Sequence, residues 1–165
     1  MAGTSSFDVV SEFDRQELVN AIDQTMREIR TRYDLKDSKS NLDLEDTQLV
    51  ITSDSEYHLT AIKDLLETKV LRRGLSLKIL DWGKVEEAGG NRYRQVVTLR
   101  KGITDDLARK INKQIRDNFP KTQPQIQGDA LRITAKSKDE LQAVIKFLRD
   151  HEADYPIALQ FTNYR

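Results

Sequence analysis

The segment QIQGDALRIT, residues 125–134, consists of two alternating runs that flank a Gly-Asp pair. Ile126 alternates with glutamine in the first run, and Leu131 and Ile133 alternate with Arg132 in the second. Alternation with period two places successive side chains on opposite faces of a sheet, and Gly-Asp is a common turn dipeptide. The segment therefore predicts a β-hairpin whose apolar side chains, Ile126 included, face packed helices while its polar side chains face away.

The hairpin is followed by a helix signal, and this combination occurs twice in the chain. Ser137 with Glu140 three residues later is a capping-box pattern, which marks the start of a helix. The segment LEDTQLVIT, residues 44–52, repeats the apolar spacing of the hairpin 82 residues earlier, and Ser55 stands at the position of Ser137. This match predicts an internal duplication and two similar domains.

Apolar spacing indicates the remaining elements in the same order in each half. Each half has the order β-α-β-β-α-β, which is that of a ferredoxin-like fold, with a four-stranded antiparallel sheet and two helices on one face. The predicted fold class is therefore α+β with two such domains. Further strands are expected at residues 6–13, 41–45, 48–52, 75–79, 93–100 and 157–161, and helices at residues 15–33, 56–73, 105–119 and 138–151.

The composition is that of a folded, water-soluble chain. Its 165 residues suffice for two small domains, each with a limited core. Cysteine is absent, which excludes disulfides and thiolate metal sites and fits a reducing compartment. We find no apolar run long enough to span a bilayer and no secretory signal pattern, so we expect a cytoplasmic protein without membrane contact.

Charge is distributed unevenly along the chain although the net charge is zero. Residues 1–89 carry 12 Lys and Arg against 18 Asp and Glu, whereas residues 90–165 carry 15 against 9. A basic half would attract phosphate. Two simpler interpretations stay open, namely attraction between the halves and charge that merely keeps the surface soluble.

Alternation also predicts the side chains on the sheet face that the helices leave uncovered. Arginine can hold phosphate with two hydrogen bonds, and glutamine amides can pair with base edges. The second-half face is polar, rich in amides and carries Arg132, so it is the better candidate for binding phosphate or a base. A solvated face without a ligand stays open as the alternative. The candidate residues are Gln125, Gln127, Arg132, Thr134, Gln160 and Thr162, with Lys136 at the strand end.

Two other surfaces have weaker signals. Val50, Leu80 and Trp82 would form an apolar patch in the first half, which supports an alternative role as a protein-interaction adaptor. A basic helix face with Arg109, Lys113 and Arg116 is more simply explained as a solvated surface.

Catalytic and cofactor motifs are not found. The histidines, His58 and His151, have no neighbours at spacings typical of a metal site or a catalytic triad. There is no glycine-rich phosphate-binding motif, and the third strand of each half lacks the aromatic residues on which RNA-recognition modules stack bases. We therefore expect a binding protein rather than an enzyme, with no cofactor and no metal.

Five segments of the chain form a distinctive combination: SFDVVSE (6–12), KGI (101–103), QIQGDALRIT (125–134), KDELQAVI (138–145) and QFTNYR (160–165). Together they resemble the YajQ family over nearly the whole chain. The resemblance implies a nucleotide-binding protein of the bacterial cytoplasm without an assigned reaction, and RNA, GTP or ATP, and cyclic di-GMP are ligands attributed to family members. Ala135-Lys136 departs from the Gly-Lys of many members.

The resemblance further implies that the two domains exchange their first strands. The first domain would comprise residues 14–99, with its sheet completed by strand 93–99. The second would comprise residues 1–13 and 100–165, with its sheet completed by strand 6–13. We expect ligand phosphate at Arg132 and Lys136, and base edges at Gln125, Gln127 and Gln160.

Overall fold

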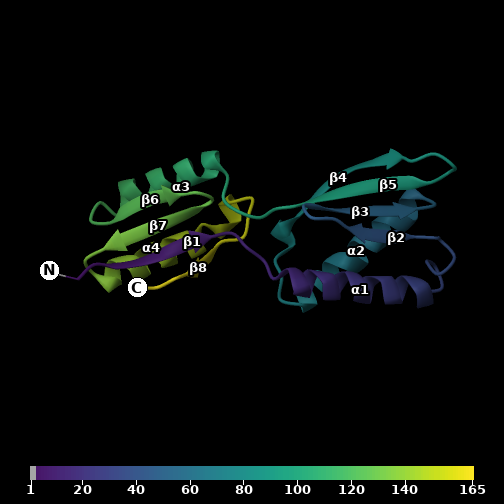
Figure 1. The fold of residues 1–165 in the computed structure, drawn as a ribbon, viewed down its shortest axis with the longest axis horizontal. Helices are drawn as coiled ribbons and strands as arrows, with labels where there is room; N and C mark the ends of the chain where they lie inside the picture. The colour runs from purple at the N-terminus through teal and green to yellow at the C-terminus, as the bar shows by residue number, and fades with distance from the viewer. Residues whose placement is uncertain (1–2) are drawn as a thin grey trace. The chain divides into compact units, whose positions relative to one another are not determined.

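The computed structural model describes residues 3–165 and confirms the predicted fold class, α+β with two ferredoxin-like domains (Figure 1). The strands are β1 Ser5–Val10, β2 Asn41–Leu44, β3 Gln48–Ser53, β4 Leu80–Glu87, β5 Tyr93–Leu99, β6 Gln123–Gln127, β7 Ala130–Ala135 and β8 Gln160–Thr162. The helices are α1 Arg15–Thr31, α2 Glu56–Arg72, α3 Asp105–Asn118 and α4 Lys138–Asp150, with short 3-10 turns at Leu77–Ile79 and Glu152–Asp154.

The strands form two separate antiparallel sheets, each within one compact unit. The terminal unit comprises the described residues up to Glu12 together with Lys101–Arg165, and its sheet has the order β6-β7-β1-β8. The middle unit is Phe13–Arg100, and its sheet has the order β2-β3-β5-β4. β1 thus lies between β7 and β8, and β5 lies between β3 and β4 (Figure 1).

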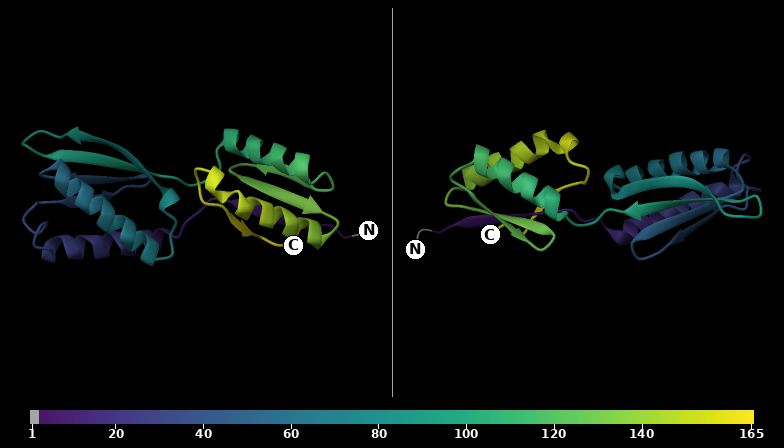
Figure 2. Two further views of the ribbon diagram at one scale, coloured as in Figure 1. Left: turned by 180° about the vertical axis from the view of Figure 1, so that it is seen from behind. Right: turned by 90° about the horizontal axis from the view of Figure 1, so that it is seen from above.

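Both helices of each unit lie on one face of its sheet (Figure 2). Side-chain caps stabilise the starts of these helices. The Asp14 carboxylate accepts from the backbone N–H of Gln16 and Glu17, and the Ser137 hydroxyl accepts from Asp139 and Glu140. None of the helices in residues 3–165 has the length and apolarity needed to cross a bilayer.

The core of the terminal unit joins the first strand to the hairpin of residues 125–134. Phe7 pairs with Ile133 and Val9 with Leu131, and all four side chains are fully buried. The prediction that Leu131 and Ile133 face the helices is confirmed. Ile126 pairs with Leu131 but remains 41% exposed, because β6 is an edge strand and one side of the residue has no neighbouring strand.

The strand predicted at residues 75–79 is wrong. The chain instead forms a 3-10 turn there, and the Ser76 hydroxyl caps it by accepting from the backbone N–H of Lys78 at 3.1 Å. The strand of this region, β4, begins only at Leu80, and its register with β5 shifts between Trp82 and Val85. A β-bulge of this kind interrupts alternation, which is why the sequence pattern did not show the strand. The last strand is also shifted, since Ile157 is buried ahead of β8.

The predicted apolar patch of Val50, Leu80 and Trp82 is wrong as well. Leu80 is only 4% exposed and belongs to the core of the middle unit, and half-buried Trp82 packs against that core. Trp82 pairs with the buried Val97, whereas Val50 alternates with buried residues and therefore lies on the opposite sheet face. The three side chains do not form one exposed surface for a protein partner.

The charge imbalance along the chain largely disappears in the folded units. The terminal unit carries 12 Lys and Arg against 11 Asp and Glu, and the middle unit carries 15 against 16. The reason is the position of two segments. The acidic side chains of Asp8 and Glu12 belong to the terminal unit, and Arg92, Arg94 and Arg100 belong to the middle unit. A long-range attraction of phosphate by one unit therefore has little support, and any anion site must depend on local charges.

Candidate functional site

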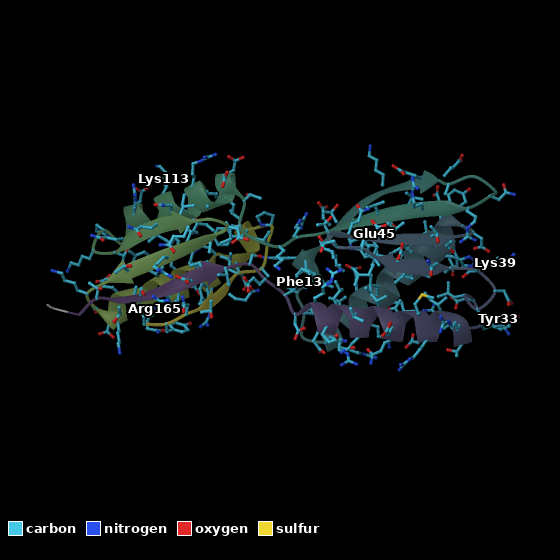
Figure 3. All side chains as sticks on the ribbon, viewed as in Figure 1. Phe13, Tyr33, Lys39, Glu45, Lys113 and Arg165 are labelled. Carbon is cyan, nitrogen blue, oxygen red and sulfur yellow. The ribbon has the colours of Figure 1, made fainter. Side chains whose placement is uncertain are left out.

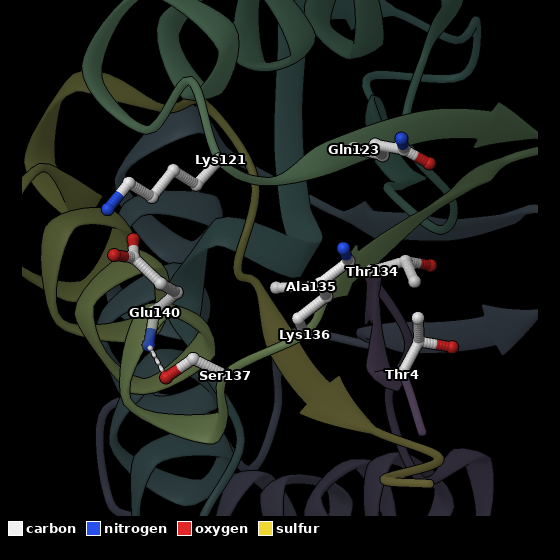
Figure 4. A pocket seen from close by; sticks show the side chains of 8 residues that line it. All are labelled: Thr4, Lys121, Gln123, Thr134, Ala135, Lys136, Ser137 and Glu140. Carbon is white, nitrogen blue, oxygen red and sulfur yellow. Dashed lines mark hydrogen bonds between the residues drawn. The ribbon is translucent and has the colours of Figure 1, made fainter. Parts of the chain in front are cut away.

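A pocket of about 550 Å³ opens in the terminal unit where β7 ends and α4 begins (Figure 4). Four segments meet there, namely the residues before β1, the start of β6 with the loop before it, the end of β7 and the first turn of α4. The lining residues are Thr4, Lys121, Gln123, Thr134, Ala135, Lys136, Ser137 and Glu140.

The turn from β7 into α4 shapes the pocket wall. Ala135 is buried at the end of the strand, and Ser137 caps the helix two residues later, with its Oγ 3.1 Å from the Asp139 nitrogen. This tight turn places exposed Lys136 between strand and helix. The positive end of the α4 dipole adds to the local potential, although Asp139 and Glu140 in the first turn offset part of it.

Two lysines provide the positive charge of the pocket. Lys121 precedes β6, Lys136 follows β7, and both are exposed. Within residues 3–165, neither ammonium group forms an ion pair, although Lys121 extends towards Glu140 (Figure 4). The hydroxyls of Thr4 and Thr134 and the amide of Gln123 add uncharged hydrogen-bonding groups. This set of donors suits a phosphate group.

Arg132, the expected phosphate ligand, lies on the open sheet face but is already paired. Its Nε donates to Asp8 Oδ1 at 2.9 Å and its Nη2 to Asp8 Oδ2 at 3.4 Å. Asn163 Nδ2 also donates to Asp8 Oδ2, at 2.8 Å. The carboxylate therefore neutralises the guanidinium locally. No local sequence pattern predicts this pairing, because Asp8 and Arg132 are 124 residues apart and become neighbours only through the register of β1 and β7.

The same contacts lower the pKa of Asp8 from its ordinary value. The hydrogen bond from Arg132 is the largest influence, and it outweighs partial burial, which acts in the opposite direction. A carboxyl whose pKa is lower in the folded state than in the unfolded chain stabilises the fold above its ordinary value of 3.8, and this contribution is lost as pH falls through the folded pKa.

We therefore predict that Asp8→Asn lowers the stability of the terminal unit at neutral pH, and that this loss becomes smaller as the pH falls below 3.8. The measurement is the urea concentration at which the amide NMR signals of the terminal unit are half lost, in the wild type and in the Asp8→Asn variant, from pH 7 to pH 2. The two midpoints should approach each other as the solution is acidified. A constant difference across this range would show that the carboxylate charge of Asp8 contributes nothing.

The structure brings only part of the predicted set to the pocket. Thr134 and Lys136 line it, and exposed Gln125 lies two residues beyond the lining Gln123 on the same face of β6. Gln127 lies at the far end of β6, about 13 Å from Gln123 at the usual rise of a strand.

Gln160 and Thr162 lie on the other edge strand, β8. Gln160 pairs with Val10, and its Oε1 accepts from the Glu12 backbone N–H at 2.7 Å. It is therefore engaged by the chain itself, at the end of β1 that is remote from Thr4.

Six lining residues were not among the candidates, and one of them, Ala135, was noted only as a departure from the Gly-Lys of many family members. Ser137 and Glu140 were visible in the sequence only as a helix cap. Thr4, Lys121 and Gln123 precede or open their strands, and no periodic pattern marks them. They become neighbours of Lys136 because β1 and β6 both pair with β7.

The two histidines lie outside this pocket. His58 Nδ1 is 2.5 Å from Asp54 Oδ1, and His151 Nδ1 is 2.7 Å from the Phe147 carbonyl oxygen. No group of three or more potential metal-ligating side chains gathers in the part of the chain that the structure describes.

The basic face of α3 borders a second hollow of about 420 Å³ that also includes Ile126. Arg109 pairs with Asp106 at 2.5 Å and Lys113, marked in Figure 3, with Asp117 at 3.5 Å. Two of the three cations thus have acidic partners on the same helix, so this surface is a weaker anion site than the pocket beside α4.

Comparisons with known proteins match the chain over nearly its full length. A family model described as "Nucleotide-binding protein YajQ-like" matches residues 5–165. Curated relatives named "Nucleotide-binding protein" include those of Chloroflexus aggregans, 64% identical, Synechococcus sp. (strain JA-3-3Ab), 62% identical, and Roseiflexus sp. (strain RS-1), 56% identical. In each case the similarity covers all of both chains.

Proposed function

This chain belongs to the YajQ-like family, and on that premise we propose that it is a non-enzymatic nucleotide-binding protein whose ligand phosphate occupies the pocket beside α4. The observation that carries the proposal is the pair of ammonium groups, Lys121 and Lys136, at one pocket without carboxylate partners among residues 3–165. The names of the relatives supply the ligand class.

The remaining contacts follow from the position of the pocket at one end of the open sheet face. Gln123 pairs with Thr134 across β6 and β7, and Gln125 pairs with Arg132 one step further along. A base attached to a phosphate in the pocket would lie over this ladder, where the glutamine amides can bind its edge. Arg132 and Asp8 would then form the floor, and Gln127 and Gln160 would meet only a ligand longer than one nucleotide.

For this reason we propose RNA or a cyclic dinucleotide such as cyclic di-GMP as the ligand. Both offer a second nucleoside with its own base, which GTP and ATP lack. Support comes from the line of exposed amides along β6, which continues past the pocket towards the hairpin turn. A location in the bacterial cytoplasm stays a prediction.

Isothermal titration with GTP, ATP, cyclic di-GMP and a short single-stranded RNA tests the proposal. We expect at least one of them to bind more tightly than inorganic phosphate, because the sheet face adds contacts that phosphate alone cannot make. A shallow salt dependence for RNA would indicate few phosphate contacts and a large share of base contacts. If no nucleotide binds at millimolar concentration, the proposed function is wrong.

The non-enzymatic part has its own test. After prolonged incubation of GTP or ATP with the protein, chromatography should show the nucleotide unchanged. Turnover proportional to the protein concentration, and retained after further purification, would contradict it.

A further inference from the structure

Strand pairing allows the two sheets to be compared position by position. Ala135 pairs with Ser5 at the end of β7, and Ser53 pairs with Tyr93 at the end of β3. The residue before Ser5 is Thr4, and the residue before Tyr93 is Arg92. Thr4, which lines the pocket, and Arg92 therefore occupy equivalent positions.

The edge strands extend the equivalence to the lysine before β6. Gln123 pairs with Thr134, and Asn41 pairs with Thr52. Gln123 and Asn41 are therefore equivalent. Lys121 stands two residues before Gln123 and Lys39 two residues before Asn41, so the two lysines occupy equivalent positions. The middle unit thus has a position that corresponds to the pocket, with a lysine at the same place.

In the middle unit, the Arg92 guanidinium occupies that position. Its Nη2 donates to the Lys39 carbonyl oxygen at 2.7 Å and approaches Thr52 Oγ1 at 3.5 Å. The backbone of Arg92 is itself fixed, since its N–H donates to Gly89 at 3.0 Å and its carbonyl accepts from Ala88 at 2.8 Å. The side chain is therefore held in place by the β4–β5 hairpin, whereas Thr4 is too short to fill the corresponding space.

The charge at the strand-to-helix turn is also reversed. Lys136 directly precedes the α4 cap Ser137, and Asp54 directly precedes the α2 cap Ser55. Asp54 contacts His58 Nδ1 at 2.5 Å. Partial burial raises the pKa of Asp54, but hydrogen bonding to His58 and the other favourable contacts outweigh it and leave the pKa below its ordinary value, so the carboxylate is ionised at neutral pH. A phosphate at this turn would meet a negative charge where the terminal unit offers a positive one.

On the basis of the proposed function, which assigns phosphate to the pocket, we infer that each chain takes one phosphate-bearing ligand, in the terminal unit alone. Two residues keep a ligand from the equivalent position of the middle unit, Arg92 because its side chain occupies the space and Asp54 because of its negative charge. Arg92 fills the space with a guanidinium from the chain itself, and Asp54 repels phosphate at the turn.

An NMR titration of the full chain with inorganic pyrophosphate tests this. In the wild type, the amide signals of Lys136 and Ser137 should shift until the site is saturated with pyrophosphate. The signals of Asp54 and Ser55 should report an affinity for pyrophosphate at least about tenfold lower, a difference of about 1.4 kcal/mol. Comparable shifts at both turns, or none at either, would overturn the single-site inference.

Paired substitutions separate the two causes. Asp54→Lys alone should not create a second site, because Arg92 still occupies the space. Asp54→Lys combined with Arg92→Thr should produce saturable shifts at residues 54 and 55 with an affinity near that of the pocket. A second site in the single variant, or none in a double variant whose Trp82 fluorescence reports a folded middle unit, would overturn the role of Arg92.

The result is distinguishable from failure of the proposed function, because pyrophosphate carries no base. If pyrophosphate shifts only the signals of residues 136–137 and no nucleotide of the panel binds, nucleotide binding is contradicted but the single site is supported. Nucleotide binding with equal pyrophosphate shifts in both units contradicts only the single site.

Discussion

Lys136→Glu should weaken binding of the tightest nucleotide in the titration panel by about tenfold to a hundredfold. The substitution removes one of the two free ammonium groups at the pocket and puts a carboxylate beside the ligand phosphate. Hydrogen bonds to charged groups contribute about 1.5–3 kcal/mol, and each 1.4 kcal/mol is a factor of ten. Lys136 is exposed, and we therefore expect the lower part of that range at physiological salt.

Lys110→Glu is the matched control for this prediction. It makes the same change in net charge on exposed α3 of the same unit, at a residue that does not line the pocket. Isothermal titration should show less than about a threefold loss of affinity, because screening weakens a distant surface charge. Equal losses in the two variants would mean that general electrostatic attraction, and not the pocket, binds the nucleotide.

Phe7→Ala should destabilise the terminal unit by about 3–5 kcal/mol, the usual cost of truncating a buried phenylalanine. Phe7 is fully buried in β1, between β7 and β8, and its ring meets that of Phe161 edge-on at 5.9 Å. Small domains have net stabilities of about 5–15 kcal/mol, so this loss would partly unfold the unit. Native-state hydrogen exchange at the amides of Leu131 and Ile133 measures it.

Phe13→Ala provides the comparison, because Phe13 lies six residues later but packs against the core of the middle unit. Its effect should be smaller, since Phe13 is only partly buried, and should appear in the fluorescence of Trp82, the single tryptophan and a middle-unit residue. If Phe7→Ala leaves exchange at Leu131 and Ile133 unchanged, β1 does not stabilise the terminal sheet.

Local patterns were sufficient to predict the element order and most of the core. Alternation identified the hairpin that became β6 and β7, and Ser137 marked the start of its helix correctly. These features depend on residues close in sequence. The strand β4 was missed because its bulge breaks the alternation on which the prediction depended.

The candidate site was predictable only where it lies on a single continuous segment. Thr134 and Lys136 belong to the end of β7, and their place at the pocket follows from the hairpin and the cap that follows it. Thr4 and Lys121 reach the same pocket through strand pairing, which no local pattern specifies. The same long-range pairing joins Asp8 to Arg132 and so changes an expected phosphate ligand into an internal ion pair.

A crystal structure of the protein with its tightest nucleotide is the most direct test of the central claim. We predict a ligand phosphate within hydrogen-bond distance of both Lys121 Nζ and Lys136 Nζ, with the base over Gln123 and Gln125 and the Asp8–Arg132 pair intact. A phosphate bound instead to Arg132 released from Asp8, to the basic face of α3 or within the middle unit would contradict the claim.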